Sequence, residues 1–427
     1  MYKLPRFLSK HIPGFQIIDV KEFLKKGLIE VHLKKDPDNH VRLCSRCNCE
    51  LKESHGKYPI KLKTMPIFNY DCFLFLWREK RFCPNCKKVR AEKLDFIAEE
   101  TPHLTREYSW WLGRLCEITP VSRAAEFTNN DPNTLWRLDF ERMRRMLQQY
   151  KIPKVKRISV DEVYGRSKKY HAKESRDKRF FTIISDLDTR RVIWVSDSRN
   201  KSALDEFFQI IGPEACAEIE VVAGDQHDPY KASVNEYCKK AVFVWDRFHI
   251  MQTFETAVND DRAWYHNYMC KGKDHEELRR LTRGKFKGLF LKKSDRRTKE
   301  EQRHIKDVLK ENEHFVYLEL IKEGMFEIFN SITAEEARDK FEQLGKYIEQ
   351  SEYFYSLKKW WGNLDQGWNT FKNYFKHRVS SSLSEGINNV IKTIKKKAYG
   401  YRNMSYFKLK IMQVCGYLNS KYVPMDF

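Results

Sequence analysis

The middle of the chain contains short runs in which apolar and polar residues alternate, a pattern typical of β-strands. Between Lys154 and Trp245 the runs RISVDEVY, RFFTIISD and RVIWVSD predict three strands, and a tight turn at Leu187–Arg190 joins the last two. A helix near Ser202–Ile211, a strand EIEVVAGD, a helix opening at Pro229 and a strand AVFVWD follow. Interleaved strands and helices predict an α/β domain.

The flanking segments have different patterns. Residues 1–95 are strand-like and carry cysteines, whereas residues 101–150 have the spacing of helices in three segments, the first two divided at Pro120. Residues 250–355 are almost wholly helical and heavily charged, and a final helix begins near Ser382. We therefore predict a multidomain α/β protein.

The composition excludes a disordered protein, since 41% of the 427 residues are hydrophobic and 14% are aromatic. A chain of this length is expected to form about two to four domains. The 80 lysines and arginines outnumber the 59 acidic residues, which gives a formal net charge of +21 and a pI near 9.3. Such an excess favours nucleic acid as the partner over a protein that is merely basic.

Nothing in the sequence predicts membrane insertion or export. No run approaches the roughly 20 apolar residues of a membrane span, and the N-terminal sequence MYKLPRFLSKHIPGF lacks the apolar region of a signal peptide. Most of the 11 cysteines are scattered, which fits a reducing compartment rather than a disulfide framework. We therefore expect a cytoplasmic protein.

Two CxxC pairs stand out among the cysteines. Cys44 and Cys47 form the first pair, Cys83 and Cys86 form the second, and 35 residues separate them. Each pair can present two thiolates to one ion, so together they predict a closed structural zinc site. Cys49 and Cys72 are reserve ligands. The alternatives are four unrelated buried cysteines or a redox pair, although neither pair opens a helix after a buried strand.

The helical segment 101–150 is a candidate helix-turn-helix, with Asn133–Arg145 as the helix that enters the major groove. The side chains expected to meet phosphates or base edges are Arg137, Arg142, Arg144 and Arg145. An ordinary helical linker is an equally good interpretation of this segment by itself.

Acidic residues lie at two predicted strand ends, where ligands bind in open α/β sheets. Asp161 lies at the end of the first strand and Asp225 ends EIEVVAGD. Two converging carboxylates repel one another unless a cation such as Mg²⁺ lies between them. Alternation sends Asp161 and Glu162 to opposite faces, so only one is a ligand, and the pattern does not say which. Asp228 precedes Pro229 and fits a helix N-cap better than a ligand.

A third carboxylate is expected from the C-terminal helix. Glu385 is the only acidic residue between Asp365 and Asp426. On a helix it shares one polar stripe with Asn388, Asn389, Lys392 and Lys396. The alternative is a surface glutamate favoured by the helix dipole.

Two further motifs have open interpretations. Asp246 and His249, in DRFH, are suited to binding metal or DNA, and equally to forming a buried polar pair at the sheet edge. Trp360, Trp361 and Trp368 suit stacking on unpaired bases, but tryptophan at helical spacing is more often part of a core.

Taken in order, these motifs resemble the DDE transposases of bacterial insertion sequences of the ISL-three type. The resemblance rests on the CxxC pairs with RFCPNC, the helix-turn-helix, ISVDEV with TIISDLDTRRVIWV, GDQHDPYKASV, and above all VWDRFH and SEGINNVIKTIKKKAYGYRN. It implies an RNase H-like core interrupted by a long helical insertion and preceded by a zinc-ribbon-like module. It also implies that Asp161, Asp225 and Glu385 are the catalytic triad, which selects Asp161 over Glu162.

The same resemblance implies two Mg²⁺ or Mn²⁺ ions per active site, bridged by Asp161, and makes DRFH similar to a DxxH element of related transposases. Gln226-His227 departs from the more apolar pair expected after Asp225, which affects the local turn. The residues expected to hold the DNA backbone near the site are Asn388, Asn389, Lys392, Lys395, Lys396 and Lys397.

The expected domains are a zinc-binding module (1–98), a helix-turn-helix (99–152), the first part of the RNase H-like core (153–249), a helical insertion (250–360), and the last core helix with the C-terminal tail (361–427). We expect a nucleoid-associated transposase that binds terminal inverted repeats and target DNA, cleaves strands and transfers them. Pairing two DNA ends predicts a homodimer or a larger assembly. The alternatives are a catalytically silent, domesticated DNA-binding regulator and an RNase H-like nuclease or resolvase.

Overall fold

The computed structural model describes residues 11–38, 41–165, 179–271, 276–284, 286–379, 382–398 and 400–423. The chain divides into two compact units. Unit 1 comprises Met1–Tyr150, Lys397–Tyr401 and Ser405–Phe427, and unit 2 comprises Lys151–Lys396 and Arg402–Met404. In the described part of the chain, no helix combines the length and the apolar character needed to cross a membrane.

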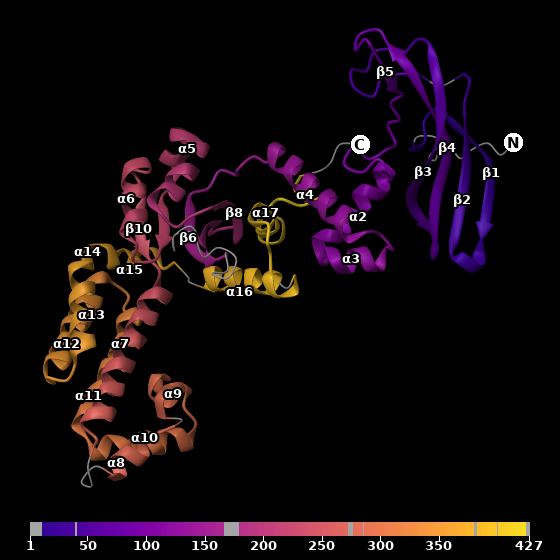
Figure 1. Ribbon diagram of the computed structural model, residues 1–427. Coiled ribbons are helices and arrows are strands. Elements are labelled where there is room, and N and C mark those ends of the chain that lie inside the picture. The colour runs from indigo at the N-terminus through magenta and orange to yellow at the C-terminus, as the bar shows by residue number, and fades with distance from the viewer. Residues whose placement is uncertain are drawn as a thin grey trace. The chain divides into compact units, whose positions relative to one another are not determined.

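Unit 1 begins with a five-stranded sheet in the order β1-β2-β4-β3, with β5 paired to β4 (Figure 1). The β2–β4 pair is parallel and the other pairs are antiparallel. A short 3₁₀ helix, η1 (Leu24–Lys26), lies between the first two strands. The strands are β1 (Phe15–Phe23), β2 (Leu28–Lys35), β3 (Ser54–Ile67), β4 (Tyr70–Cys83) and β5 (Lys88–Ala91).

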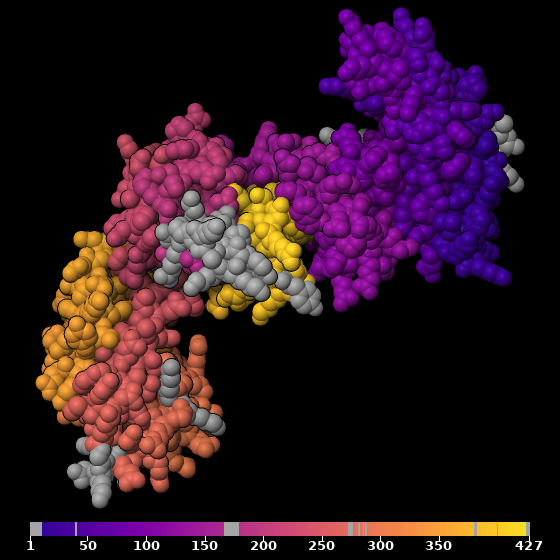
Figure 2. Space-filling model, in the orientation of Figure 1, coloured from indigo at the N-terminus to yellow at the C-terminus, as the bar shows by residue number. Residues whose placement is uncertain are grey.

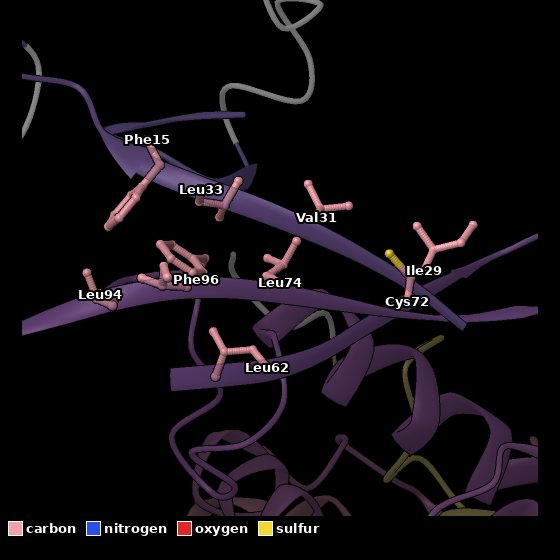
Figure 3. Close-up of a cluster of buried hydrophobic side chains, with 10 residues drawn as sticks. Phe15, Ile29, Val31, Leu33, Leu62, Cys72, Leu74, Leu94 and Phe96 are labelled. Carbon is pink, nitrogen blue, oxygen red and sulfur yellow. The ribbon is translucent and has the colours of Figure 1, made fainter. Parts of the chain in front are cut away.

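One face of this sheet is apolar because hydrophobic residues alternate along its strands. In β2 the buried positions are Ile29, Val31 and Leu33, which point to the same side as every second residue of a strand must. Figure 3 shows these side chains facing Leu74 of β4 and Phe96, which lies beyond the last strand. The pattern is that of a sheet with one covered face.

Unit 1 continues with three helices, α2 (Arg106–Ile118), α3 (Val121–Phe127) and α4 (Pro132–Gln149), and ends with α17 (Met404–Cys415). Asp131 caps α4 by accepting a hydrogen bond from the backbone N–H of Thr134 at 2.7 Å. A buried polar cluster attaches α17 to this bundle: Lys410 donates to Asp139 at 3.1 Å and to the Cys116 carbonyl at 2.7 Å. The C-terminal helix is therefore part of the N-terminal unit.

Unit 2 contains a second five-stranded sheet in the order β10-β9-β6-β7-β8. Strands β6, β7 and β8 are antiparallel, and β9 and β10 run parallel to β6. The five strands predicted in this region are confirmed, including the turn between β7 and β8. They are β6 (Arg157–Tyr164), β7 (Phe180–Asp186), β8 (Arg191–Ser196), β9 (Val221–Gly224) and β10 (Val242–Trp245).

Helices α5 (Lys201–Glu218) and α6 (Asp228–Tyr237) lie between these strands in sequence, and a long helical region follows β10. Helices α11 and α13 pack against α7, and α12 packs against α11 (Figures 1 and 2). The helical region comprises α7 (Arg247–Tyr268), α8 (Glu276–Leu281), α9 (Phe286–Leu291), η4 (Ser294–Arg296), α10 (Lys299–Glu311), α11 (Glu313–Asn330), α12 (Ala334–Glu349), α13 (Tyr355–Gln366), α14 (Trp368–Phe371), α15 (Asn373–His377) and α16 (Ser382–Lys397).

The three tryptophans considered for base stacking, Trp360, Trp361 and Trp368, pack against aromatic residues of this region. Trp361 and Trp368 both stack on Phe341, with ring centroids 5.3 and 5.2 Å apart, and Trp360 packs on Phe254. The core interpretation of these residues is therefore the one that the structure supports.

Candidate active site and metal centre

The two CxxC pairs converge in unit 1. The Sγ atoms of all four cysteines lie within 4.8 Å of one another, and the separations include 3.4 Å (Cys47 to Cys83), 3.5 Å (Cys47 to Cys86) and 3.9 Å (Cys44 to Cys86). Four zinc–sulfur bonds of about 2.3 Å in a tetrahedron place the sulfurs about 3.8 Å apart. The cluster therefore fits a structural zinc ion.

Local structure explains why these sulfurs meet. Cys83 ends β4, and an isolated β-bridge joins Cys44 to Glu92 beyond β5. In each pair a backbone N–H points at the first sulfur, from Arg46 to Cys44 and from Cys86 to Cys83, both at 3.4 Å. The reserve ligands are not needed.

Cys49 is outside the group of four. Cys72 lies in the apolar sheet core of Figure 3, where burial raises the pKa of its thiol to about 11.

In unit 2, Asp161 lies in β6 at the centre of a set of polar contacts. Its Oδ1 accepts the backbone N–H of Glu162 at 2.7 Å and lies 3.6 Å from His249 Nε2. Its Oδ2 accepts a hydrogen bond from Asn388 Nδ2 of α16 at 2.8 Å. Residues from three distant parts of the chain therefore meet at this carboxylate.

Asp225 directly follows β9 and carries a buried oxygen, Oδ1, for which the described residues provide no hydrogen-bond partner. Burial raises the pKa of this carboxyl group; His249 and His227 oppose the shift, and Asp161 adds to it. A buried acceptor without a partner is costly. A cation beside Asp225 would compensate for it.

Asp246 and His249 belong to the same charged neighbourhood. Asp246 caps α7 by accepting the backbone N–H of Phe248 at 2.8 Å. Burial raises the pKa of Asp246, the Phe248 hydrogen bond opposes the shift, and Asp161 and Asp225 reinforce it. Burial disfavours the charged form of His249, but its contact with Asp161 and the neighbouring carboxylates outweigh burial and raise its pKa. DRFH therefore has a structural role, the cap, and a position beside the acidic residues.

Glu162 points to a different set of partners. Tyr230 donates its hydroxyl to Glu162 Oε1 at 3.0 Å, and Arg199 Nη1 lies 3.6 Å from Oε2. Burial, together with the charge of Asp225, raises the pKa of this carboxyl group. The alternation along β6 thus separates the two acids as expected, and Asp161 is the one that faces α16.

Helix α16 is attached to β6 at two points. Asn388 binds Asp161, and two turns later Lys395 Nζ donates to the carbonyls of Tyr164 at 3.2 Å and Gly165 at 3.1 Å. Burial lowers the pKa of Lys395. Lys395 and Asn388 therefore make contacts inside the protein, and the DNA contacts that the sequence predicted for both stay a prediction.

Glu385 lies one helical turn before Asn388, and its side chain is exposed. Within the described ranges, the four cysteines are the only group of three or more His, Cys, Asp or Glu side chains placed to hold a metal ion, and Asp161, Asp225 and Glu385 do not form such a group. Four other residues of α16 that were predicted to contact DNA are exposed: Asn389, Lys392, Lys396 and Lys397.

Two of the arginines predicted to contact DNA lie on the exposed side of α4. Arg137 and Arg144 are exposed, and Arg144 pairs with Glu141 at 3.1 Å. Arg145 is half-buried and pairs with Glu99 at 3.0 Å and with Glu100.

Arg142 is different, since only 2% of it is exposed. It donates to the Gly113 carbonyl at 3.1 Å and pairs with Glu117. The expectation that Arg142 contacts DNA is wrong, because its face of α4 packs on α2.

With this geometry established, comparison with known proteins identifies the family. A model of a transposase family of the DDE, ISL3 type matches residues 158–411. This chain belongs to that family. The matched span of the transposase runs from β6 to α17 and includes Asp161, Asp225 and Glu385.

Two curated relatives are similar to this transposase. The transposase of insertion sequence element IS1001 from Bordetella parapertussis is 24% identical over 399 residues, which cover 90% of each chain. The transposase of IS1557 from Mycobacterium tuberculosis is 30% identical over 112 residues, which cover 26% of this chain and 23% of the relative.

Proposed function

We propose that this transposase binds the terminal inverted repeats of an insertion sequence, cleaves DNA strands there and transfers them to target DNA. Asp161, Asp225 and Glu385 are the proposed catalytic residues. The observation that carries the proposal is the buried, unpartnered oxygen of Asp225 beside the Asp161 carboxylate, at the edge where α16 is attached to β6. The order of three antiparallel strands followed by two parallel ones supports an RNase H-like core.

The donor set fits hard divalent cations such as Mg²⁺ or Mn²⁺, since it consists of carboxylate oxygens, one of which is buried at Asp225 without a partner among the described residues. Asp161, Asp225 and Glu385 would hold two such ions. When bound, these ions supply Lewis acidity to the attacking water or 3′-hydroxyl and to the leaving oxygen.

The protein's own groups prepare this site. Asn388 orients Asp161 through Oδ2, and its own Oδ1 is buried without a partner in the described part of the chain. Lys395 fixes the next part of α16 to the end of β6, which holds the helix that carries Glu385. His249 approaches Asp161 from α7. These contacts limit the reorganisation needed when DNA binds.

DNA binding is assigned to unit 1 and to the exposed side of α16. The helices α2, α3 and α4 form the proposed helix-turn-helix, in which α4 enters the major groove with Arg137 and Arg144 exposed. Asn389, Lys392 and Lys396 would contact the backbone near the catalytic residues. Two DNA ends require at least two copies of the transposase, acting in the bacterial cytoplasm near the nucleoid.

The decisive experiment replaces Asp161 with Asn and supplies labelled DNA ends of the element. We expect strand cleavage to be lost while end binding is retained, because the substitution removes a charge without changing shape. Precleaved ends mixed with a target plasmid then test joining, since a nuclease or resolvase gives no joined product. Unchanged cleavage by Asp161→Asn would exclude the proposed site, and an inactive wild-type protein that binds ends would be a regulator.

A further inference from the structure

The hairpin between β3 and β4 ends in an unusual turn. Ile67 pairs with Tyr70, so the turn consists of Phe68 and Asn69 alone. Phe68 has a φ of +52°, and 91% of its surface is exposed.

Stability does not explain this residue. A turn position with positive φ favours Gly, Asn or Asp, because a large side chain on Cβ crowds the backbone there. An aromatic ring in water also forgoes the gain from burial. Phe68 is therefore unfavourable on both counts, and strained exposed positions of this kind are found where a residue serves a ligand.

The turn lies close to the start of α4. Lys63 of β3 donates to the Thr128 and Asn129 carbonyls, both at 2.9 Å, in the loop that precedes α4. Asp71, three residues after Phe68, pairs with Lys63 at 2.9 Å and accepts a hydrogen bond from Asn129 at 3.1 Å. This network fixes the base of the hairpin to the loop that leads into α4.

The neighbouring β1–β2 turn adds positive charge at the same end of the sheet. The backbone N–H of Asp71 donates to the Gly27 carbonyl at 2.9 Å, which places the two turns side by side. Lys25 and Lys26 of η1 are exposed, and Leu24 beside them is 57% exposed. An apolar tip next to paired lysines complements double-stranded DNA, which offers stacked bases bordered by phosphates.

We propose that Phe68 is a DNA wedge, which inserts its ring into the stack of the terminal duplex next to the groove read by α4, while Lys25 and Lys26 bind the adjoining phosphates. The inference rests on the proposed function of unit 1 in end binding and adds a second contact to it. The occupant is double-stranded DNA, because two exposed lysines lie at the neighbouring turn and the hairpin is fixed to the loop that leads into the proposed DNA-reading helix.

The test measures binding of the full-length protein to fluorescein-labelled duplexes from the two ends of the element, by anisotropy. Phe68→Ala and Phe68→Asn are expected to weaken binding about tenfold, since both variants lose the aromatic ring that stacks on a base. Phe68→Asn should also melt at the same or a higher temperature, because asparagine suits the turn. Tyr355→Ala, which removes an aromatic side chain of 81% exposure from unit 2, is the matched control and should bind normally.

Two further readouts distinguish a wedge from other roles. With 2-aminopurine placed at successive steps of the duplex, the wild type should raise the fluorescence at one step, and both Phe68 variants should abolish that rise. Lys25→Ala with Lys26→Ala should lower the salt dependence of binding by about 1.8 in the log–log slope, whereas the Phe68 variants should leave the slope unchanged.

The contrary outcomes are distinct. Normal end binding by both Phe68 variants, or a wild type that binds ends without unstacking any base, would overturn the wedge and leave the proposed function intact. Loss of self-association in the Phe68 variants, measured by sedimentation without DNA, would assign the ring to a second copy of the chain. A wild type that binds no terminal duplex would overturn the proposed function itself.

Discussion

The four cysteines of unit 1 and the acidic residues of unit 2 are both sets of metal-binding groups, but only the cysteines lie at ligand distances. All four sulfurs are within 4.8 Å of one another, whereas Asp161, Asp225 and Glu385 do not form such a group. The difference has an electrostatic cause. Neutral thiols can pack together, whereas ionised carboxylates repel one another unless a cation is present.

The comparison separates the proposed structural centre from the proposed catalytic one. A closed site of four cysteines contributes directly to folding, and an open carboxylate site must leave room for DNA and for ions that arrive with it. Metal removal should therefore unfold the region around the cysteines, whereas at the carboxylates it should stop the chemistry and leave the fold intact.

The largest effect is expected at the zinc centre. Cys83→Ser, or a strong chelator, should lose the ion and unfold the N-terminal sheet region, since structural zinc contributes about 10–16 kcal/mol in small domains. Zinc content and circular dichroism measure this. Cys49→Ser is the matched control, because Cys49 lies next to the cluster but outside it, and it should retain one zinc per chain. A folded, zinc-free wild type would contradict the assignment.

At the carboxylate site the corresponding change should affect chemistry and leave the fold intact. Asn388→Ala removes the hydrogen bond to Asp161 and should lower strand cleavage about 10- to 100-fold, with more Mg²⁺ needed for half-maximal rate. End binding should be unchanged. Asn389→Ala, one residue away and exposed, is the control. Equal effects of the two variants would mean that the amide of Asn388 does not position Asp161.

Asp225 tests the same difference between the two sites through the free energy of unfolding. Asp225→Asn removes a buried charge with an unpartnered oxygen, so the variant should be more stable than the wild type without divalent cations, by about 1–3 kcal/mol. Mn²⁺ should raise the melting temperature of the wild type and have no effect on the variant. Thermal melts with and without Mn²⁺ measure both, and a destabilised variant would show that Asp225 is satisfied without a cation.

The sequence predicts a site well when its residues form a short pattern, and poorly when the site joins residues that are distant along the chain. The CxxC pairs and the alternating strands are short patterns, so both were predictable. The contact between Asn388 and Asp161 joins residues 227 positions apart and depends on how α16 packs, which no local pattern specifies.

The contacts that two charged residues make inside the protein show the same limit of local sequence patterns. Arg142 and Lys395 looked like DNA contacts because they belong to basic helices. Their partners, the carbonyls of Gly113, Tyr164 and Gly165 and the carboxylate of Glu117, are groups that only the tertiary fold brings close. The polar stripe on α16 did contain the signal for Asn388, since it predicted that the residue lies near Glu385 on one face.

The smallest expected effect concerns a buried ionisable group that, unlike Asp225, lies outside both sites. His314 of α11 is 6% exposed, stacks on Tyr265 with ring centroids 3.8 Å apart, and lies 3.2 Å from Ser351 through Nδ1. Burial lowers its pKa to about 3. The unfolded chain therefore binds a proton near pH 6.5 that the folded chain does not bind until about pH 3.

Acid therefore favours the unfolded state, because that state binds the proton at His314 more readily than the folded state does. The contribution of His314 to stability is complete above about pH 6.5 and declines by about 1.4 kcal/mol for each pH unit below it. His314→Gln should flatten this decline, which urea unfolding of unit 2 at pH 5.5 and 7.5 would measure through its helical signal. His304→Gln is a control, because His304 lies on the neighbouring helix α10. An unchanged slope in His314→Gln would show that burial does not control the ionisation of His314.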